Sequence, residues 1–87
     1  MHQPPGWDFQ AVDDLIGLAR RDYRQAPRIA NANRTYDEAR RGDVKKLQNR
    51  DGVWRLRAGD WRVSFRPAED DRAMLILAID KRSDAYD

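Results

Sequence analysis

Apolar and charged residues alternate most regularly in the stretch 52–66, which reads G-V-W-R-L-R-A-G-D-W-R-V-S-F-R. Apolar residues and arginines alternate on both sides of Gly59-Asp60, which is the period-two pattern of half-buried strands. A glycine followed by an aspartate suits a two-residue type II′ turn. The pattern therefore predicts a β-hairpin. Its register pairs Ala58 with Trp61, Arg57 with Arg62, Leu56 with Val63, Arg55 with Ser64, and Trp54 with Phe65.

This register sorts the two faces of the hairpin by their chemistry. The apolar face carries Trp54, Leu56, Ala58, Trp61, Val63 and Phe65. The polar face carries Arg55, Arg57, Arg62, Ser64 and Arg66. Two arginines that face each other on a sheet repel and cost stability. We therefore expect the polar face to attract an external anion, and phosphate is the obvious candidate.

Two helices are expected before the hairpin. Apolar residues recur at spacings of three and four from Phe9 to about residue 24, which predicts a helix with one apolar face. A second helix is expected to begin near Ala26, because Pro27 is tolerated in a first turn but not in a helix interior. Gly42 is a plausible stop for it. The two helices are predicted to form an antiparallel pair.

The remaining segments complete one domain that spans residues 1–87. Residues 1–8 are expected to form an irregular lead-in or a short edge strand, and residues 43–51 an ordered connector. The run 73–79, A-M-L-I-L-A-I, is apolar at every position, as in a strand buried on both faces. The sequence thus predicts an α+β fold, with two N-terminal helices packed on an antiparallel sheet of three to four strands.

The composition excludes several classes of function. The 87 residues include no cysteine and one histidine, His2 near the N-terminus, so a thiolate site or a histidine-based metal site has almost no support and no cofactor is expected. No apolar run approaches the roughly twenty residues that span a bilayer, so a cytoplasmic location is expected. The formal charge is only +2, yet residues 40–66 hold nine cations against three anions. Such local asymmetry is typical of nucleic-acid binding.

Three stretches resemble successive landmarks of the RelE/ParE-type toxins of bacterial type II toxin-antitoxin systems. They read D-V-K-K-L at 43–47, G-V-W-R-L-R-A-G-D-W-R-V at 52–63 and K-R-S-D-A-Y at 81–86. The resemblance is closer to the RelE branch, the mRNA interferases. It implies a compact α+β fold that usually opens with an N-terminal strand, and a cognate antitoxin as partner. For RelE-like members it also implies an endoribonuclease that enters the ribosomal A site and cuts mRNA.

The resemblance further implies where the chemistry lies. Arg55, Arg57 and Arg62 match the basic residues of the central strands in that family. Lys81, Arg82 and Tyr86 match its C-terminal segment. Outside this catalytic set, RNA-backbone contacts without sequence readout are expected of Lys45, Lys46 and Arg66.

Metal-free RNA cleavage needs a base for the 2′-hydroxyl, a group that stabilises charge on the phosphate, and an acid for the leaving oxygen. Arginine stays protonated and is a poor base, so Tyr86 is the best candidate base, or a stacking residue, and Lys81 the second. We expect Arg62 and Arg57 to clamp the phosphate and Arg55 to stabilise or protonate the leaving oxygen.

Two other functions stay open at this point. ParE-like members share the fold but act on DNA gyrase and need no nuclease residues. A catalytically worn scaffold that only binds RNA or an antitoxin is the third possibility. In that case the arginines would be an ordinary solvated face, and Tyr86 a frayed terminal residue or one that packs against the core edge.

Overall fold

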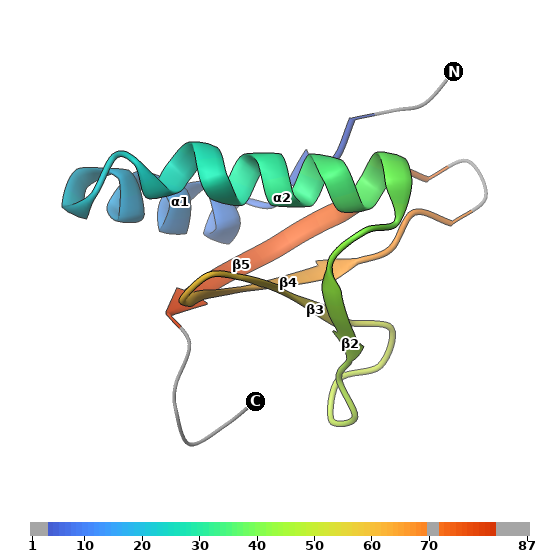
Figure 1. The fold of residues 1–87 in the computed structure, drawn as a ribbon. Helices are drawn as coiled ribbons and strands as arrows, with labels where there is room; N and C mark the ends of the chain where they lie inside the picture. The colour runs from blue at the N-terminus through green and yellow to red at the C-terminus, as the bar shows by residue number, and fades with distance from the viewer. Residues whose placement is uncertain (1–3, 70–71, 82–87) are drawn as a thin grey trace.

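The computed structural model describes residues 4–69 and 72–81. Two helices cover one face of a five-stranded sheet (Figure 1). In chain order the elements are β1 (Gly6–Trp7), α1 (Phe9–Arg21), α2 (Gln25–Ala39), β2 (Asp43–Lys46), β3 (Trp54–Ala58), β4 (Trp61–Arg66) and β5 (Leu75–Lys81). The strands lie in the order β1-β5-β4-β3-β2. The predicted α+β fold with two N-terminal helices is confirmed, although the sheet has five strands and is mixed, because β1 pairs parallel to β5.

The predicted hairpin is confirmed in every pair of its register. β3 and β4 are antiparallel, with Arg57 opposite Arg62 and Trp54 opposite Phe65. Gly59 has a φ of +61°, and among the described non-glycine residues only Arg40 has a positive φ. A positive φ at the first turn residue alone is the sign pattern of a type II′ turn. The turn therefore fixes which side chains share a face.

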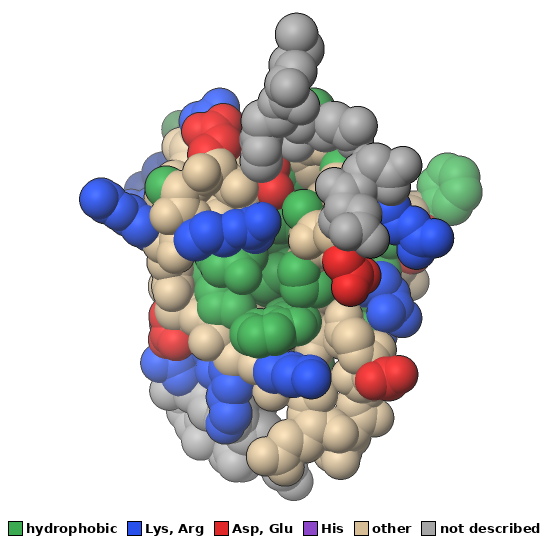
Figure 2. Space-filling view, turned by 90° about the vertical axis from the view of Figure 1, so that its right-hand side faces the viewer, with side chains coloured by type: hydrophobic (Ala, Val, Ile, Leu, Met, Phe, Trp, Pro, Cys, Tyr) green, Lys and Arg blue, Asp and Glu red, His purple; other side chains and the backbone are tan. Residues whose placement is uncertain are grey.

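The apolar face of the hairpin forms the centre of the core. Leu56, Val63 and Phe65 are at most 1% exposed and pack with Ile29 of α2. The ring centroids of Phe65 and Tyr36 lie 5.2 Å apart, a tilted aromatic pair. Figure 2 shows that hydrophobic side chains also reach the surface at the end of the molecule on the right of Figure 1, where Lys and Arg side chains surround them.

Both helices are shorter at their C-terminal ends than expected. The carboxylate of Asp8 accepts from the Phe9 N–H at 2.8 Å and caps α1, which ends at Arg21 rather than near residue 24. The helix α2 ends at Ala39, and Arg40 takes the left-handed conformation (φ 56°) that terminates it, so the assignment of Gly42 as the stop was wrong. The Arg40 guanidinium lies over the Tyr36 ring in the last turn of α2, and this cation–π contact stabilises the left-handed cap.

The connector expected at residues 43–51 contains a strand. Asp43–Lys46 pairs antiparallel with β3 along the edge of the sheet. Val44 is its one apolar residue, and it packs against the core while the other three side chains are exposed. Charged side chains of this kind protect a sheet edge from pairing with other chains. The short edge strand expected within residues 1–8 is confirmed as β1, whereas Phe9 begins α1.

The apolar run 73–79 forms β5, but burial on both faces is only partly right. Ile76 and Ile79 are buried, whereas Leu75 is 36% exposed. In a regular strand, Ile76 and Ile79 would lie on opposite faces, because they are three residues apart. A bulge places both on the helix-covered face: Phe65 pairs with Ile76 and Ser64 with Ala78, which leaves one extra residue on β5. In the part of the chain that the structure describes, no helix is both long and apolar enough to cross a membrane.

Candidate functional site

The sheet surface opposite the helices carries the hairpin arginines, and we call it the arginine face. Its members on β3 and β4 are Arg55, Arg57, Arg62, Ser64 and Arg66. Their exposure is uneven, because Arg55 and Ser64 are each only 5% exposed, whereas Arg66 is exposed at the end of β4. The surface is therefore not the evenly solvated basic strip that the sequence pattern alone would allow.

A row of four charges crosses the arginine face from one edge strand towards the other. Asp43, Arg57, Arg62 and Asp80 occupy opposed positions on β2, β3, β4 and β5. The Asp43 carboxylate lies 3.7 Å from Arg57 Nη1. Carboxylates at both ends of the row offset the repulsion between the two central arginines. The expectation that this pair needs an external anion is therefore corrected, because the sheet supplies counter-charges of its own.

Arg55 is the most enclosed cation of this face. Its side chain is 7% exposed, and Nη1 lies 3.8 Å from Asp43 Oδ1. That distance is too long for a hydrogen bond, and Nη1 is buried without a hydrogen-bond partner among the described residues. A buried guanidinium donor left unsatisfied costs stability, so Arg55 retains capacity for one more acceptor.

The segment between β2 and β3 folds back over the arginine face and encloses a cavity of about 260 Å³, which we call the arginine pocket. The Leu47 N–H donates to the Val53 carbonyl at 3.0 Å, and Arg66 Nη1 donates to the Asp51 carbonyl at 3.3 Å, which holds the segment in place. The pocket is lined by Leu47, Gln48, Asn49, Arg50, Arg62, Ser64 and Asp80. It combines two guanidinium groups, a hydroxyl and a carboxylate, so it can bind an anion and also accept a proton.

The two lysines of β2 point to opposite faces of the sheet. Lys45 pairs with Arg55 and lies on the arginine face, whereas Lys46 pairs with Trp54 on the helix-covered face. Both are exposed. The structure therefore brings Lys45 towards the predicted site residues and separates Lys46 from them.

Of the predicted C-terminal residues, the structure describes Lys81, and it does not lie with the arginines. Lys81 pairs with Trp61, which places it on the helix-covered side of the sheet. Arg82 and Tyr86 lie outside the described residues. Of the described residues that were expected to be catalytic, Arg62 is the one that lines the arginine pocket.

The acidic members of the site were missed from the sequence. Asp80 directly follows the apolar run 73–79 and gives no local signal, and only the register of β4 with β5 places it opposite Arg62. Asp43 was missed because its segment had been assigned to a connector. Among the described residues, no group of three or more His, Cys, Asp and Glu side chains could hold a metal ion.

Comparisons with known proteins agree with this architecture. A family model described as the ParE toxin of the type II toxin-antitoxin system, parDE, matches residues 7–86. A curated protein of Methanocaldococcus jannaschii, the candidate toxin RelE1, is 41% identical over 44 residues. That match covers 51% of this chain and 49% of the relative, so the chain spans about half the length of the curated relative that it matches.

Solved toxin structures share the fold at low sequence identity. The YoeB/ParE toxin from Agrobacterium tumefaciens superposes with a TM-score of 0.78 at 17% identity, covering 93% of this chain and 100% of that one. The YoeB dimer from Staphylococcus aureus gives 0.75 at 18% identity, with 95% and 100% covered. The RelBE2 toxin-antitoxin complex from Mycobacterium tuberculosis gives 0.65 at 22% identity, with 94% and 100% covered.

Proposed function

The chain belongs to the family of ParE toxins of type II toxin-antitoxin systems, and we propose that it inhibits translation by cutting mRNA on the ribosome without a metal ion, as its resemblance to the RelE branch of these toxins implies. One observation carries the nuclease proposal. The arginine pocket places Arg62, which can bind a phosphate, beside the carboxylate of Asp80. A phosphate ligand next to a proton acceptor supplies two of the three groups that cleavage by the RNA 2′-hydroxyl requires, and solvent can supply the acid.

In the proposed reaction, Asp80 takes the proton of the 2′-hydroxyl. The 2′-oxygen then bonds to phosphorus, and the bond between phosphorus and the 5′-oxygen breaks. Arg62 stabilises the charge that builds on the phosphate oxygens, and the 5′-oxygen takes a proton from solvent. The products are a 2′,3′-cyclic phosphate and a 5′-hydroxyl. Tyr86 remains the other candidate base, because it could activate the same hydroxyl or stack on a base.

The other arginines support Arg62 in this proposal. Arg57 lies directly opposite Arg62 and adds a second cation for the scissile phosphate. The Arg55 side chain is only 7% exposed, so it acts on the phosphate through the field of its charge. Lys45 and Arg66 lie on the same face, where they can hold the RNA backbone on either side of the pocket.

We propose a cognate antitoxin as the protein partner. Several structural relatives were solved as toxin-antitoxin complexes, among them YoeB-YefM from Staphylococcus aureus and DinJ-YafQ from E. coli. Both relatives are under 25% identical to this chain, so they support the fold of the toxin and suggest the kind of partner. An antitoxin would keep the toxin inactive until it is removed.

The test uses purified protein and ribosomes programmed with a defined mRNA in a buffer that contains the Mg²⁺ that ribosomes need, and the same ribosomes without the protein control for contaminating nucleases. We expect cleavage that leaves cyclic phosphate ends, and a loss of roughly 10²- to 10⁴-fold in rate for Asp80→Asn, because a general base is removed. Asp60→Asn is the matched control, since it removes the same charge from the exposed hairpin turn. If Tyr86→Phe abolishes cleavage and Asp80→Asn does not, the base is Tyr86.

Inhibition of DNA gyrase is the second candidate, favoured by the ParE description of the matching family model. The same protein is therefore added to a gyrase supercoiling assay. Intact mRNA together with inhibited supercoiling would refute the nuclease proposal. Intact mRNA and unaffected gyrase would indicate the catalytically worn scaffold.

A further inference from the structure

The side of α1 that faces away from the sheet is apolar. The structure buries Ala11 and Leu18 of this helix, so the opposite side of the helix covers the core. Most of the large hydrophobic side chains that are exposed among the described residues lie on α1 or directly after it, and they form what we call the outer stripe: Phe9, Val12, Ile16 and Tyr23, at 92%, 40%, 46% and 76% exposed. The helix therefore has a second apolar face, which a single copy of the chain leaves in water.

The outer stripe has the spacing of a helix-pairing seam. Phe9, Ile16 and Tyr23 recur every seven residues, and Val12 lies between the first two. Apolar residues at such heptad positions let two helices pack along one seam. Exposed apolar surface that is contiguous in this way marks protein interfaces. We infer that the outer stripe is the contact between two copies of this chain, whose α1 helices pack antiparallel.

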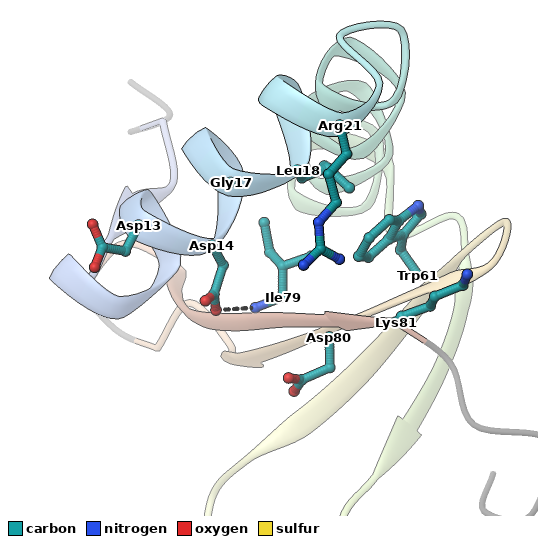
Figure 3. A pocket seen from close by; sticks show the side chains of 9 residues that line it. All are labelled: Asp13, Asp14, Gly17, Leu18, Arg21, Trp61, Ile79, Asp80 and Lys81. Atoms are coloured by element: carbon teal, nitrogen blue, oxygen red, sulfur yellow. Dashed lines mark hydrogen bonds between the residues drawn. The ribbon is translucent and has the colours of Figure 1, made fainter.

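The charges beside the outer stripe indicate a second copy as the occupant. Asp13 and Arg20 are both exposed, and they are seven residues apart, so they flank the stripe on the same side, two helical turns from each other. Figure 3 shows Asp13 pointing away from β5, whereas Asp14 points towards it, where its Oδ2 accepts from the Ile79 N–H at 2.9 Å. One edge of the stripe thus carries a negative charge near one end and a positive charge near the other.

These charges are placed symmetrically about Ile16. Asp13 lies three residues before it and Arg20 four residues after it, which is about 4.5 Å and 6 Å along the helix axis. A two-fold axis beside Ile16 that reverses the helix direction therefore brings Asp13 of each copy level with Arg20 of the other. Phe9 and Tyr23 are each seven residues from Ile16, so they meet in the same way. The stripe is complementary to itself, as a closed two-fold dimer requires.

A parallel pair of α1 helices lacks this match. It would put the two Asp13 carboxylates at one level and the two Arg20 guanidinium groups at another, so like charges would approach each other. Such repulsion selects against a parallel arrangement, as flanking charges do in coiled coils.

The proposed dimer is independent of the proposed nuclease function. The helices cover one face of the sheet and the arginine pocket lies on the other, so both pockets stay open in the dimer. The contact is one helix face on each copy, which places it at the small end of specific interfaces, below about 1,200 Å². Association should therefore depend on protein concentration.

The test is sedimentation velocity of the full chain over about a hundredfold range of concentration. We expect the mass to rise from 10.2 kDa towards twice that value. Ile16→Glu places two carboxylates at the two-fold axis and should weaken dimerisation at least about 100-fold, as for an interface hot spot. Asp13→Arg and Arg20→Asp should each weaken it at least about tenfold, and the double variant should restore it to within about threefold of the wild type.

Arg34→Asp is the matched control, because it reverses a charge on the exposed surface of α2, and it should leave dimerisation unchanged. Circular dichroism at low concentration checks that every variant is folded. A wild type that stays monomeric at every concentration would overturn the inference, and so would equal weakening by Arg34→Asp. If Ile16→Glu disrupts the dimer but the double variant is not restored, the antiparallel arrangement is wrong. A monomer whose Ile16→Glu variant no longer binds a cognate antitoxin would assign the stripe to that partner and refute the dimer.

Discussion

The two faces of the β3–β4 hairpin share one backbone ladder but are stabilised in different ways. On the helix-covered face, Leu56, Val63 and Phe65 are buried by close packing, which depends on the volume of each side chain. On the arginine face, stability depends on the balance of charge along a row of residues from four different strands. The apolar face should therefore control folding, while the arginine face can be changed for chemistry at a small cost in stability.

The largest effect should come from the apolar face. Phe65→Ala removes a fully buried ring and leaves a cavity, so we expect the free energy of unfolding to fall by about 3–5 kcal/mol. Small domains have roughly 5–15 kcal/mol in total, so a substantial part of the stability would be lost. Urea unfolding measures this effect, with Phe65→Leu as the milder control. A loss below about 1 kcal/mol would mean that the core does not depend on this ring.

The second effect should separate activity from folding on the arginine face. Arg62→Ala removes the guanidinium that is proposed to stabilise the phosphate, and we expect cleavage to slow by roughly 10²- to 10³-fold. The free energy of unfolding should change by no more than about 1 kcal/mol, because partly exposed charges contribute little. The matched control is Arg34→Ala, which removes the same charge from the exposed surface of α2. Equal losses of activity in both variants would point to net charge and not to the pocket.

The difference between the two faces also explains how much of the molecule could be predicted from the sequence. The hairpin was predictable because its period-two pattern and the Gly59-Asp60 turn are both local in sequence. The edge strand β2 was not, because D-V-K-K offers one apolar residue and no alternation. An edge strand needs only one buried position, so its sequence resembles that of a loop.

The candidate site was predictable only for its cations. The arginines of β3 and β4 lie on one hairpin, so a local register brings them together. Asp43 and Asp80 reach the same row from strands on either side, and Asp80 does so through a sheet whose register shifts at a bulge. A shift of one residue moves a side chain to the opposite face, so local pattern alone cannot place such partners.

A smaller effect should reveal how far the carboxylates compete with RNA. Asp43→Asn removes the negative charge that lies near Arg55 and Arg57. We expect the free energy of unfolding to fall by about 1 kcal/mol, because Asp43 itself is more than half exposed. Affinity for a short single-stranded RNA should rise several-fold at low salt, since the arginine face loses a negative charge that repels phosphate. Weaker RNA binding in fluorescence anisotropy would show that Asp43 holds the arginines in a binding geometry instead of competing with phosphate.

The smallest effect should come from an ion pair outside the charge row. Asp22 and Arg24 pair between the helices at 3.0 Å, with side chains 33% and 73% exposed. The Arg24 guanidinium, and next the Arg24 backbone N–H, hold the pKa of Asp22 below its ordinary value of 3.8. A depressed carboxyl pKa stabilises the fold above the unfolded pKa, and this contribution is lost as the pH falls through the folded pKa. Asp22→Asn should therefore be slightly less stable than the wild type at neutral pH, and the difference should vanish once the pH falls below the folded pKa of Asp22 and shrink in high salt. Urea unfolding from pH 7 to pH 2 measures this difference. Asp22→Asn should destabilise the protein less than Asp43→Asn does. Equal losses would mean that the sheet does not strengthen the charge row, and that the arginine face does not differ in stability from an exposed ion pair.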